Sequence, residues 1–185
     1  MKLLVVATSV REGRVGKKVA DWFVGEVEKD GKFEVDLVDL KELNLSYELP
    51  EKSPASVHDS NYDDEATNLW ADKVNQSDAV VFVIPEYNHG YPASFKNAVD
   101  HIFHEWNGKP VSFVGYGSAG APYAIGSFAP VAAWTHMDTI NAHVGISEVW
   151  AAFDEDEKLL HGDYHAYEVK TMLDALEAKI ISKKS

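Results

Sequence analysis

Continuous apolar runs alternate along this chain with stretches in which apolar residues recur at helical spacing. Residues 3–7 form an apolar run that stops at Thr8, a pattern typical of a strand buried on both faces of a parallel sheet. After Gly13 and Gly16, apolar residues recur every three or four positions with charges between them. These residues are Val15, Val19, Trp22, Phe23 and Val27. The beginning of the chain therefore predicts a strand, a loop and a helix with one face on the sheet.

Four further strands are expected. In residues 33–38, Phe33, Val35 and Leu37 alternate with Glu34, Asp36 and Val38, which predicts a half-exposed strand at the sheet edge. Residues 79–84 and 111–115 are apolar runs that predict two buried strands, and a fifth strand is expected at about 142–149.

Helical periodicity fills the intervals between these strands. Asp63 or Asp64 can cap a helix, and Pro92 opens another after the third strand. A further helix is expected over about 124–138 and a last one near the end of the chain, whereas residues 40–62 predict a loop. The core-facing helical residues are expected to be Ala66, Leu69, Trp70 and Val74, then Phe95, Ala98, Val99, Ile102 and Phe103, and finally Val169, Leu173, Leu176 and Ile180.

The order of these elements predicts one α/β domain over residues 1–185. Strands that alternate with helices form a parallel sheet with helices on both faces, and five such strands favour the order 2-1-3-4-5 in a three-layer, doubly wound fold. The 185 residues, of which 45% are hydrophobic, suffice for one core. The loops after strands one, three and four should then lie at the same edge of the sheet, where ligands bind in such folds.

Charge and composition narrow the possible chemistry. The net charge of −13 repels nucleic acid and anionic membrane surfaces, so neither is an expected partner. The chain has no cysteine, so redox chemistry would need a bound cofactor. The apolar run at the beginning is too short for a signal segment and no other run approaches a membrane span, which favours a cytoplasmic protein.

The first loop, residues 8–16, predicts an anion site. It leads into a helix whose free backbone N–H groups and positive dipole end favour negative charge. Ser9 offers a hydroxyl, Arg11 and Arg14 offer charged donors, and Gly13 and Gly16 allow the backbone close approach. Lys17 and Lys18 complete the cationic cluster, which would otherwise be an ordinary solvated helix start.

The second and third loops predict contacts with a planar ring. In residues 85–92, Tyr87 and Tyr91 can stack on a ring while Asn88 bonds its polar edge. In residues 116–120, small side chains would let backbone N–H groups approach a ring carbonyl.

Together the three loops resemble the NADPH-dependent FMN reductase family, a flavodoxin-like family that includes quinone, azo-dye and chromate reductases. The resemblance follows chain order from Ser9-x-Arg11, through residues 85–88 with Lys96-Asn97-Ala98 beyond them, to residues 117–120. It implies that the FMN phosphate is held by Ser9, Arg11, Arg14, Val15 and Gly16. It implies that the isoalloxazine ring is bordered by Pro85, Glu86, Tyr87, Asn88, Tyr116, Gly117, Ser118, Ala119 and Gly120. Two residues depart from the family pattern, because Thr8 and Ala121 stand where glycine is common.

The resemblance also implies a mechanism and an assembly. NADPH or NADH would reduce bound FMN and leave, and a flavin, quinone or similar acceptor would then use the same face in a ping-pong sequence. The protein need supply no acid or base, so no catalytic residue is assigned, and His89 is either a neighbour of the substrate or a plain turn residue. A homodimer or homotetramer is implied, for which Trp106, Trp134 and Trp150 are candidate anchors, although burial in the core is the favoured interpretation of each.

Three alternatives compete with this interpretation. A non-enzymatic flavodoxin-type carrier or a flavin-based redox sensor would use the same fold, and NAD(P)H oxidation would separate these from an enzyme. A serine hydrolase is suggested by Ser118 within residues 116–120, with Asp138 and His143 downstream. A metal site is suggested by the spacing of His101 and His104, or of His161 and His165, although neither pair has an evident third ligand. The sequence leaves open the choice of nicotinamide, the acceptor, the oligomer size and any role of residues 40–62.

Overall fold

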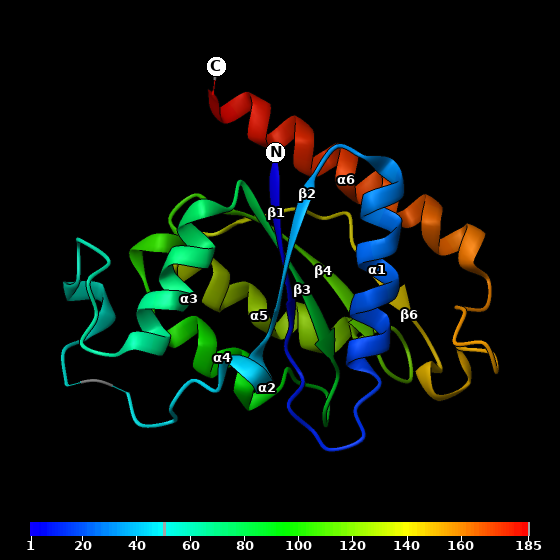
Figure 1. Cartoon of the computed structure of the whole chain (residues 1–185), viewed down its shortest axis with the longest axis horizontal. Coiled ribbons are helices and arrows are strands. Elements are labelled where there is room, and N and C mark those ends of the chain that lie inside the picture. Colours follow the sequence, from blue (N-terminus) through cyan, green and yellow to red (C-terminus); the bar gives the residue numbers. More distant parts are fainter. Residues whose placement is uncertain (50, 185) are drawn as a thin grey trace.

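The computed structural model describes residues 1–49 and 51–184 and confirms a parallel sheet of strand order β2-β1-β3-β4-β5, with β6 also paired to β4 (Figure 1). Every pairing in the sheet is parallel. The strands are β1 (Lys2–Ala7), β2 (Glu34–Asp39), β3 (Ala79–Pro85), β4 (Pro110–Tyr116), β5 (Asp138–Thr139) and β6 (Val144–Ile146). The three central strands are the apolar runs of the sequence, since only a strand covered on both faces buries every side chain of such a run.

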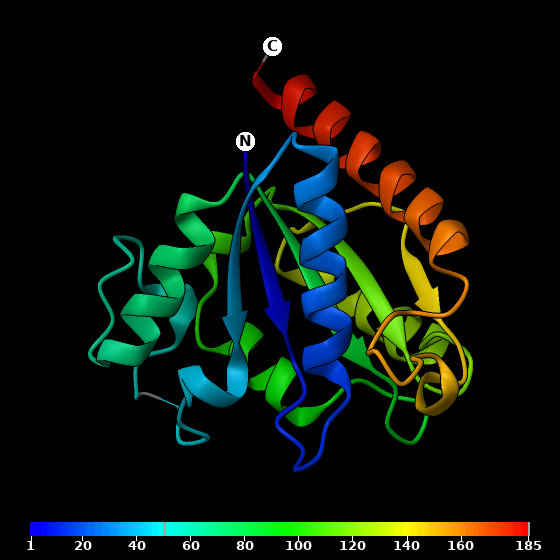
Figure 2. The ribbon, with the colours of Figure 1, turned by 45° about the vertical axis from the view of Figure 1, so that its right-hand side comes forward.

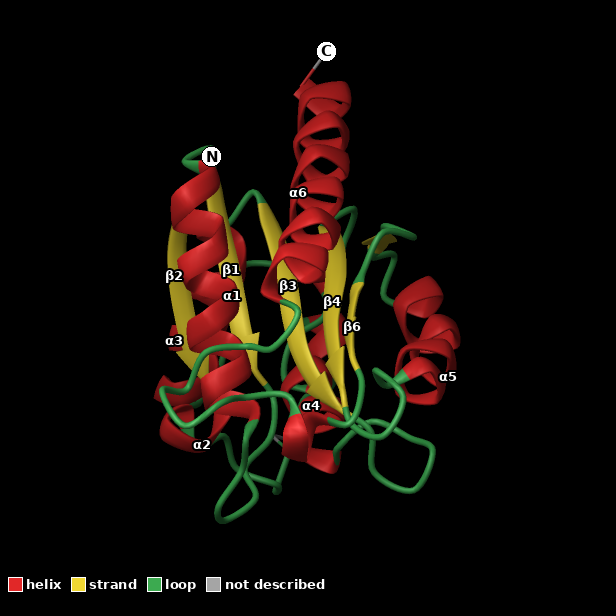
Figure 3. Cartoon of the chain, turned by 90° about the vertical axis from the view of Figure 1, so that its right-hand side faces the viewer, coloured by secondary structure: helices red, strands yellow, loops and turns green. Residues whose placement is uncertain are grey.

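Helices cover both faces of the sheet and divide the apolar interior into two cores. On one face lie α1 (Gly16–Asp30) and α6 (Gly162–Lys184), and on the other lie α3 (Glu65–Gln76), α4 (Ala93–Asp100) and α5 (Pro122–Trp134) (Figures 1 and 3). The remaining short elements are α2 (Leu40–Leu43), η1 (Pro54–Ser56), η2 (His104–Trp106) and η3 (Val149–Ala151). The doubly wound architecture is therefore confirmed, and the segment 40–62 differs from the prediction in containing α2 and η1.

The fifth strand differs from its prediction because it is broken into two pieces. The first piece, β5, pairs with the beginning of β4, and the second, β6, pairs with its end. Between them the chain leaves the sheet, and the Ser112 hydroxyl donates a hydrogen bond of 2.6 Å to the Ala142 carbonyl. A short edge strand pairs with backbone hydrogen-bonding groups of its neighbour without offering a long unpaired edge to other chains.

Several predictions of burial were wrong at the margins of the sheet. Leu37 in β2 is exposed, whereas Val38 is buried in the core that contains Leu40 of α2 and Trp70 of α3. Leu69 in α3 is half exposed. Trp106 is fully buried as expected, but Trp134 and Trp150 are 76% and 69% exposed, so burial in the core was wrong for both.

The carboxyl ends of the strands lie along one edge of the sheet, and the loops that follow them gather there (Figure 2). No helix among residues 1–49 and 51–184 has the length and apolar character needed to cross a membrane.

Candidate functional site

The register of the sheet brings the three predicted loops to a common edge. Ala7, the last residue of β1, pairs with Asp39 of β2 and Val83 of β3. Pro85 at the end of β3 pairs with Tyr116 at the end of β4. The segments 8–15, 86–92 and 117–121 therefore leave the sheet side by side, as the strand order predicts (Figure 2).

The first loop ends at an uncapped helix N-terminus. Gly13 turns the chain with a φ of 63°, and α1 begins at Gly16 with no side-chain cap from Val15 and no acidic residue in its first turn. The first N–H groups of α1 therefore have no side-chain acceptor, and the positive end of the helix dipole faces the loop. This arrangement suits a phosphate.

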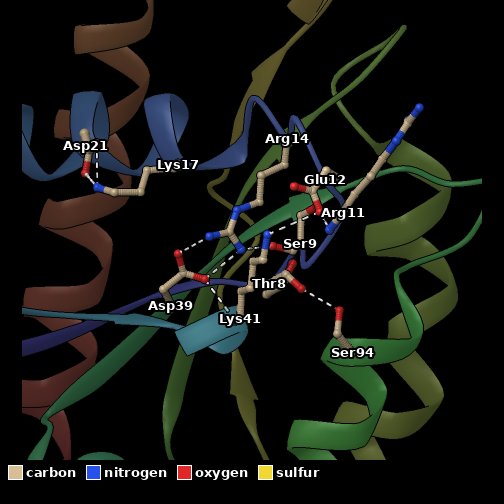
Figure 4. A network of polar contacts seen from close by, with 10 residues as sticks. All are labelled: Thr8, Ser9, Arg11, Glu12, Arg14, Lys17, Asp21, Asp39, Lys41 and Ser94. Carbon is tan, nitrogen blue, oxygen red and sulfur yellow. Dashed lines mark hydrogen bonds and ion pairs between the residues drawn. The ribbon is translucent and has the colours of Figure 1, made fainter. Parts of the chain in front are cut away.

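Arg14 does not extend into the loop as an anion ligand. Its guanidinium forms a two-pronged ion pair with Asp39, with N···O distances of 2.8 and 2.5 Å, and Nη1 also donates to the carbonyl oxygen of Ser9 (Figure 4). Both side chains are largely buried, at 13% and 7% exposure. Arg14 thus holds the loop against the end of β2, and Asp39 is a site residue that sequence analysis missed.

Arg11 is the cation of the cluster that extends outward from the loop. Lys17 is paired with Asp21 and Lys18 with Glu157, both on the exposed surface of the molecule. Arg11 is exposed and its side chain points away from the Arg14 network in Figure 4. Within the described residues it is therefore the guanidinium best placed to reach an incoming anion.

Ser9 joins the first loop to the second. Its Oγ lies 2.7 Å from the Tyr87 hydroxyl and accepts a longer hydrogen bond, 3.4 Å, from the Arg11 backbone N–H. Thr8 is fully buried and donates its hydroxyl proton to the Val83 carbonyl at 2.9 Å. The departure at Thr8 therefore adds a tie between β1 and β3 without opening the loop.

The second loop is a tight turn around Asn88 and His89. Backbone hydrogen bonds of 2.9 and 3.0 Å run in both directions between Tyr87 and Gly90, and Asn88 and His89 both have positive φ, 51° and 60°. Such a turn normally selects Asn and Gly, so His89 occupies a strained position. The His89 ring stacks on Tyr123 with centroids 4.2 Å apart and an interplanar angle of 3°.

Glu86 turns away from the loop surface to serve as a helix cap. Its Oε2 accepts hydrogen bonds from the backbone N–H groups of Tyr123 (2.9 Å) and Ala124 (3.3 Å) in the first turn of α5. The N-cap residue of α5, Ala121, has a φ of 62° and supplies no side-chain acceptor, so Glu86 takes that role. The departure at Ala121 thus places an alanine where glycine would be unstrained.

The third loop is held by the segment that follows β6. Backbone N–H groups of Glu148 and Val149 donate to the carbonyls of Ser118 and Gly117. Gly120 is packed against Gly145. A Cβ added to Gly120 would lie 2.9 Å from the Gly145 Cα. Ser118 and Ala119 remain exposed at the tip of this fixed loop.

Tyr116 has its ring under the first loop, at the end of the site opposite to the one expected. A Cβ on Gly16 would lie 2.2 Å from the Tyr116 hydroxyl, so the phenol lies against the beginning of α1. The hydroxyl is buried and has no hydrogen-bond partner at ordinary distance. Burial raises the pKa of Tyr116 and Tyr87 acts in the same direction, whereas the neighbouring Ser9 hydroxyl acts to lower it. An orphaned donor and a close-fitting glycine at a helix N-terminus are features of a site built for a ligand.

The predicted residues are therefore brought together, but in different roles. Ser9, Arg11, Val15 and Gly16 form the first loop, Pro85 to Asn88 the second, and residues 117–120 the third. Arg14 and Glu86 hold the loops, and Tyr116 links the third to the first. Asp39 and Tyr123 had no signal in the sequence, because each is joined to the site only by tertiary contacts.

The structure contradicts the serine hydrolase. Asp138 pairs with Pro110 at the beginning of β4 and is ion-paired with Lys179, whereas Ser118 follows the end of β4. The length of a strand thus separates the two, which is too far for a catalytic triad.

The histidine pairs do not form metal sites in the described part of the chain. No group of three or more potential ligands comes together there. His101 lies just past α4, buried between Thr67 and the Ser46 carbonyl, and His165 contacts Glu168. His101 and His104 also fail to share one helix, because α4 ends at Asp100.

Comparisons with known proteins relate this chain to one family of reductases. A model described as NADPH-dependent FMN reductase matches residues 1–151. Over 120 residues the chain is 44% identical to an NAD(P)H-dependent FMN reductase of Schizosaccharomyces pombe, and the match covers 64% of this chain and 59% of that relative, so the chain spans about three fifths of its length. A quinone reductase of Pseudomonas putida is 39% identical over 69 residues, 35% of each chain. The flavoenzyme NAD(P)H:(acceptor) oxidoreductase FerB from Paracoccus denitrificans has the same fold, with a TM-score of 0.74, 22% identity, and coverage of 96% of this chain and 98% of that one.

Proposed function

Because the chain belongs to the NADPH-dependent FMN reductase family, we propose that it binds FMN and transfers electrons from NADPH or NADH to a small-molecule acceptor. The hydrogen bond between Ser9 and Tyr87 is the observation that carries this proposal. It joins a loop suited to a phosphate with a loop suited to a planar ring, at the edge of the sheet where doubly wound folds bind nucleotides.

The residues present fit FMN at both ends. The phosphate would be held by Ser9, Arg11, Val15 and Gly16, with Arg14 fixing the loop from behind through Asp39. The ring would be bordered by residues 85–88 and 117–120, whose positions are fixed by the Glu86 cap and by the hydrogen bonds from Glu148 and Val149.

When bound, FMN supplies the hydride chemistry, taking electrons from the nicotinamide and passing them to the acceptor in the ping-pong order that we propose. The chain's own residues hold and orient the group. Pro85 and Gly120 are buried while Asn88, Ser118 and Ala119 are exposed, so the loops present one open side to a second substrate. Quinones and flavins are the acceptors that we propose, by analogy with the Pseudomonas quinone reductase.

We also propose a homodimer or homotetramer in which α5 forms the interface. No residue of α5 is charged, yet only Ala124, Phe128 and Ala132 are buried, and Trp134 is 76% exposed. Beside Trp134 an apolar groove of about 470 Å³ lies between α5 and α4. A helix that is apolar all round is normally covered, and α5 lies at the margin of the molecule (Figure 3).

The proposal is tested by spectra of the protein loaded with FMN, recorded anaerobically before and after addition of NADPH or NADH. Bleaching of the flavin band, followed by its return on addition of a quinone, is the expected result. An inert yellow protein would favour the carrier or sensor, and a protein that fails to take up FMN would refute the proposal.

A matched pair of variants tests the phosphate loop. Arg11→Ala removes the outward guanidinium and should weaken FMN binding about tenfold or more, because a charge-assisted hydrogen bond contributes about 1.5–3 kcal/mol. Lys17→Ala removes an exposed lysine that is paired with Asp21, and should leave FMN affinity nearly unchanged. Equal effects of the two variants would show that only general charge matters.

A further inference from the structure

The Tyr116 hydroxyl is an unusual atom in this fold because it is buried without a hydrogen-bond partner at ordinary distance. Tyr116 is 5% exposed, and its hydroxyl is one of two orphaned side-chain atoms in the described residues, the other being an oxygen of Asp30. The Asp30 atom lies at the far end of α1, remote from the loops. A buried donor without an acceptor destabilises a protein, so its presence beside a predicted ligand loop calls for a functional reason.

The position of the hydroxyl is fixed by its surroundings. The ring belongs to the last residue of β4, and the hydroxyl occupies the space that a side chain on Gly16 would fill. The Cβ of Ser9 lies 3.6 Å from the same point, so the phenol reaches the underside of the phosphate loop between Ser9 and α1. Since burial raises the pKa of Tyr116, the phenol keeps its proton and remains a donor at neutral pH.

Ser9 has one proton and two acceptor positions to share among its neighbours. In the structure its Oγ accepts from the Arg11 N–H and exchanges a hydrogen bond with the Tyr87 hydroxyl. These contacts use two of the three positions, and no hydrogen bond of ordinary length joins Ser9 to Tyr116, although the Ser9 hydroxyl lies near enough to lower the pKa of Tyr116. A phosphate oxygen in the loop would change this count, because it accepts both from Ser9 and from backbone N–H groups such as that of Arg11.

We propose that Tyr116 is a positioning residue for a phosphate monoester, donating to Ser9 Oγ when Ser9 gives its own proton to the phosphate. The inference rests on the proposed function, and it names the feature of FMN that is read, its terminal phosphate. Tyr116 then acts through Ser9, and the buried donor acquires a full hydrogen bond in the loaded protein. Binding of the monoester is thereby favoured over binding of the same flavin with a terminal hydroxyl.

The proposal predicts opposite effects of one substitution in two states. Tyr116→Phe keeps the buried ring and removes only the hydroxyl. Without ligand it should leave the melting temperature unchanged or raise it, because an unsatisfied donor is removed. With ligand it should weaken FMN binding about three- to tenfold, the effect of one neutral hydrogen bond, and change riboflavin binding less than twofold.

Tyr62→Phe is the matched control. Tyr62 is equally buried, but its hydroxyl donates to the Glu105 carboxylate at 3.0 Å, far from the loops. Its loss should lower the melting temperature and leave the ratio of FMN to riboflavin affinity unchanged. In a Ser9→Ala background, Tyr116→Phe should have no further effect on that ratio, because the intermediary is absent.

The experiment measures flavin fluorescence quenching with FMN and with riboflavin, and the ³¹P chemical shift of bound FMN, for each variant. A fall in the affinity ratio in Tyr116→Phe, with a changed ³¹P shift, supports the proposal. If the wild type prefers FMN and Tyr116→Phe keeps the same preference, the role of Tyr116 is overturned and the proposed function is not. A wild-type protein that binds both flavins equally would overturn the inferred recognition of the phosphate and leave the proposed function standing. A wild-type protein that binds neither flavin would overturn the proposed function as well.

Discussion

Gly16 is the position at which the structure predicts the sharpest response to a single added methyl group. In Gly16→Ala the new Cβ would lie 2.2 Å from the Tyr116 hydroxyl and 3.0 Å from its ring carbon Cζ. The phenol cannot swing aside freely, because its residue ends a buried central strand and is only 5% exposed. Gly25, in the same helix, has no atom within 4 Å of the corresponding Cβ and provides the control.

The two substitutions are expected to change the free energy of unfolding in opposite directions. Overpacking of a fixed interior costs about 1–3 kcal/mol, from which up to about 1 kcal/mol is recovered because alanine favours a helix more than glycine does. Gly16→Ala should therefore destabilise the protein by up to about 2 kcal/mol. Gly25→Ala meets no atom and should stabilise it by about 0.5–1 kcal/mol.

Urea denaturation followed by circular dichroism measures both effects, provided that the m-values agree. The double variant with Tyr116→Phe should recover part of the loss at Gly16, because the closest atom is removed while the contact of 3.0 Å with Cζ remains. Equal stabilities for Gly16→Ala and Gly25→Ala would refute the placement of the phenol under the phosphate loop.

Three other predictions follow from named contacts. Asp39→Asn leaves the buried Arg14 guanidinium without its carboxylate and should lower the free energy of unfolding by about 3 kcal/mol in urea, whereas Asp21→Asn, at an exposed pair, should change it by less than about 1 kcal/mol. Asp64→Ala removes the N-cap of α3 and should cost about 1 kcal/mol at pH 7. The hydrogen bond from the Thr67 hydroxyl lowers the pKa of Asp64 below its ordinary value of 3.8. The stabilisation by the Asp64 carboxylate is therefore present at neutral pH and should disappear as the pH falls through the folded-state pKa. A stability difference between Asp64→Ala and wild type that persists in strong acid would contradict this cause. Trp134→Ser should leave the melting temperature nearly unchanged and shift the mass measured by light scattering toward the monomer, and an unchanged oligomer would exclude α5 as the interface.

The sequence by itself determined the sheet and the edge at which the site lies. The apolar runs of β1, β3 and β4 can be buried in only one way, with helices on both faces, and parallel strands bring their following loops to a common edge. Asp64 was recognisable as a cap because an acceptor before a helical pattern acts on residues three positions away. These are local rules, in which the chain supplies both partners within a few residues.

Only the tertiary structure decided which side chains of the loops face a ligand and which hold the loops in place. Arg14 looked like a phosphate ligand until folding placed Asp39, 25 residues away, against its guanidinium. Glu86 looked like a ring contact until α5 presented its uncapped N–H groups, 37 and 38 residues further along the chain. Charge and hydrogen-bonding capacity can be read from a residue type, but the partner that uses them is set by which strands and helices become neighbours. The same limit explains Tyr116, whose direction depends on the empty space that Gly16 leaves beneath the helix.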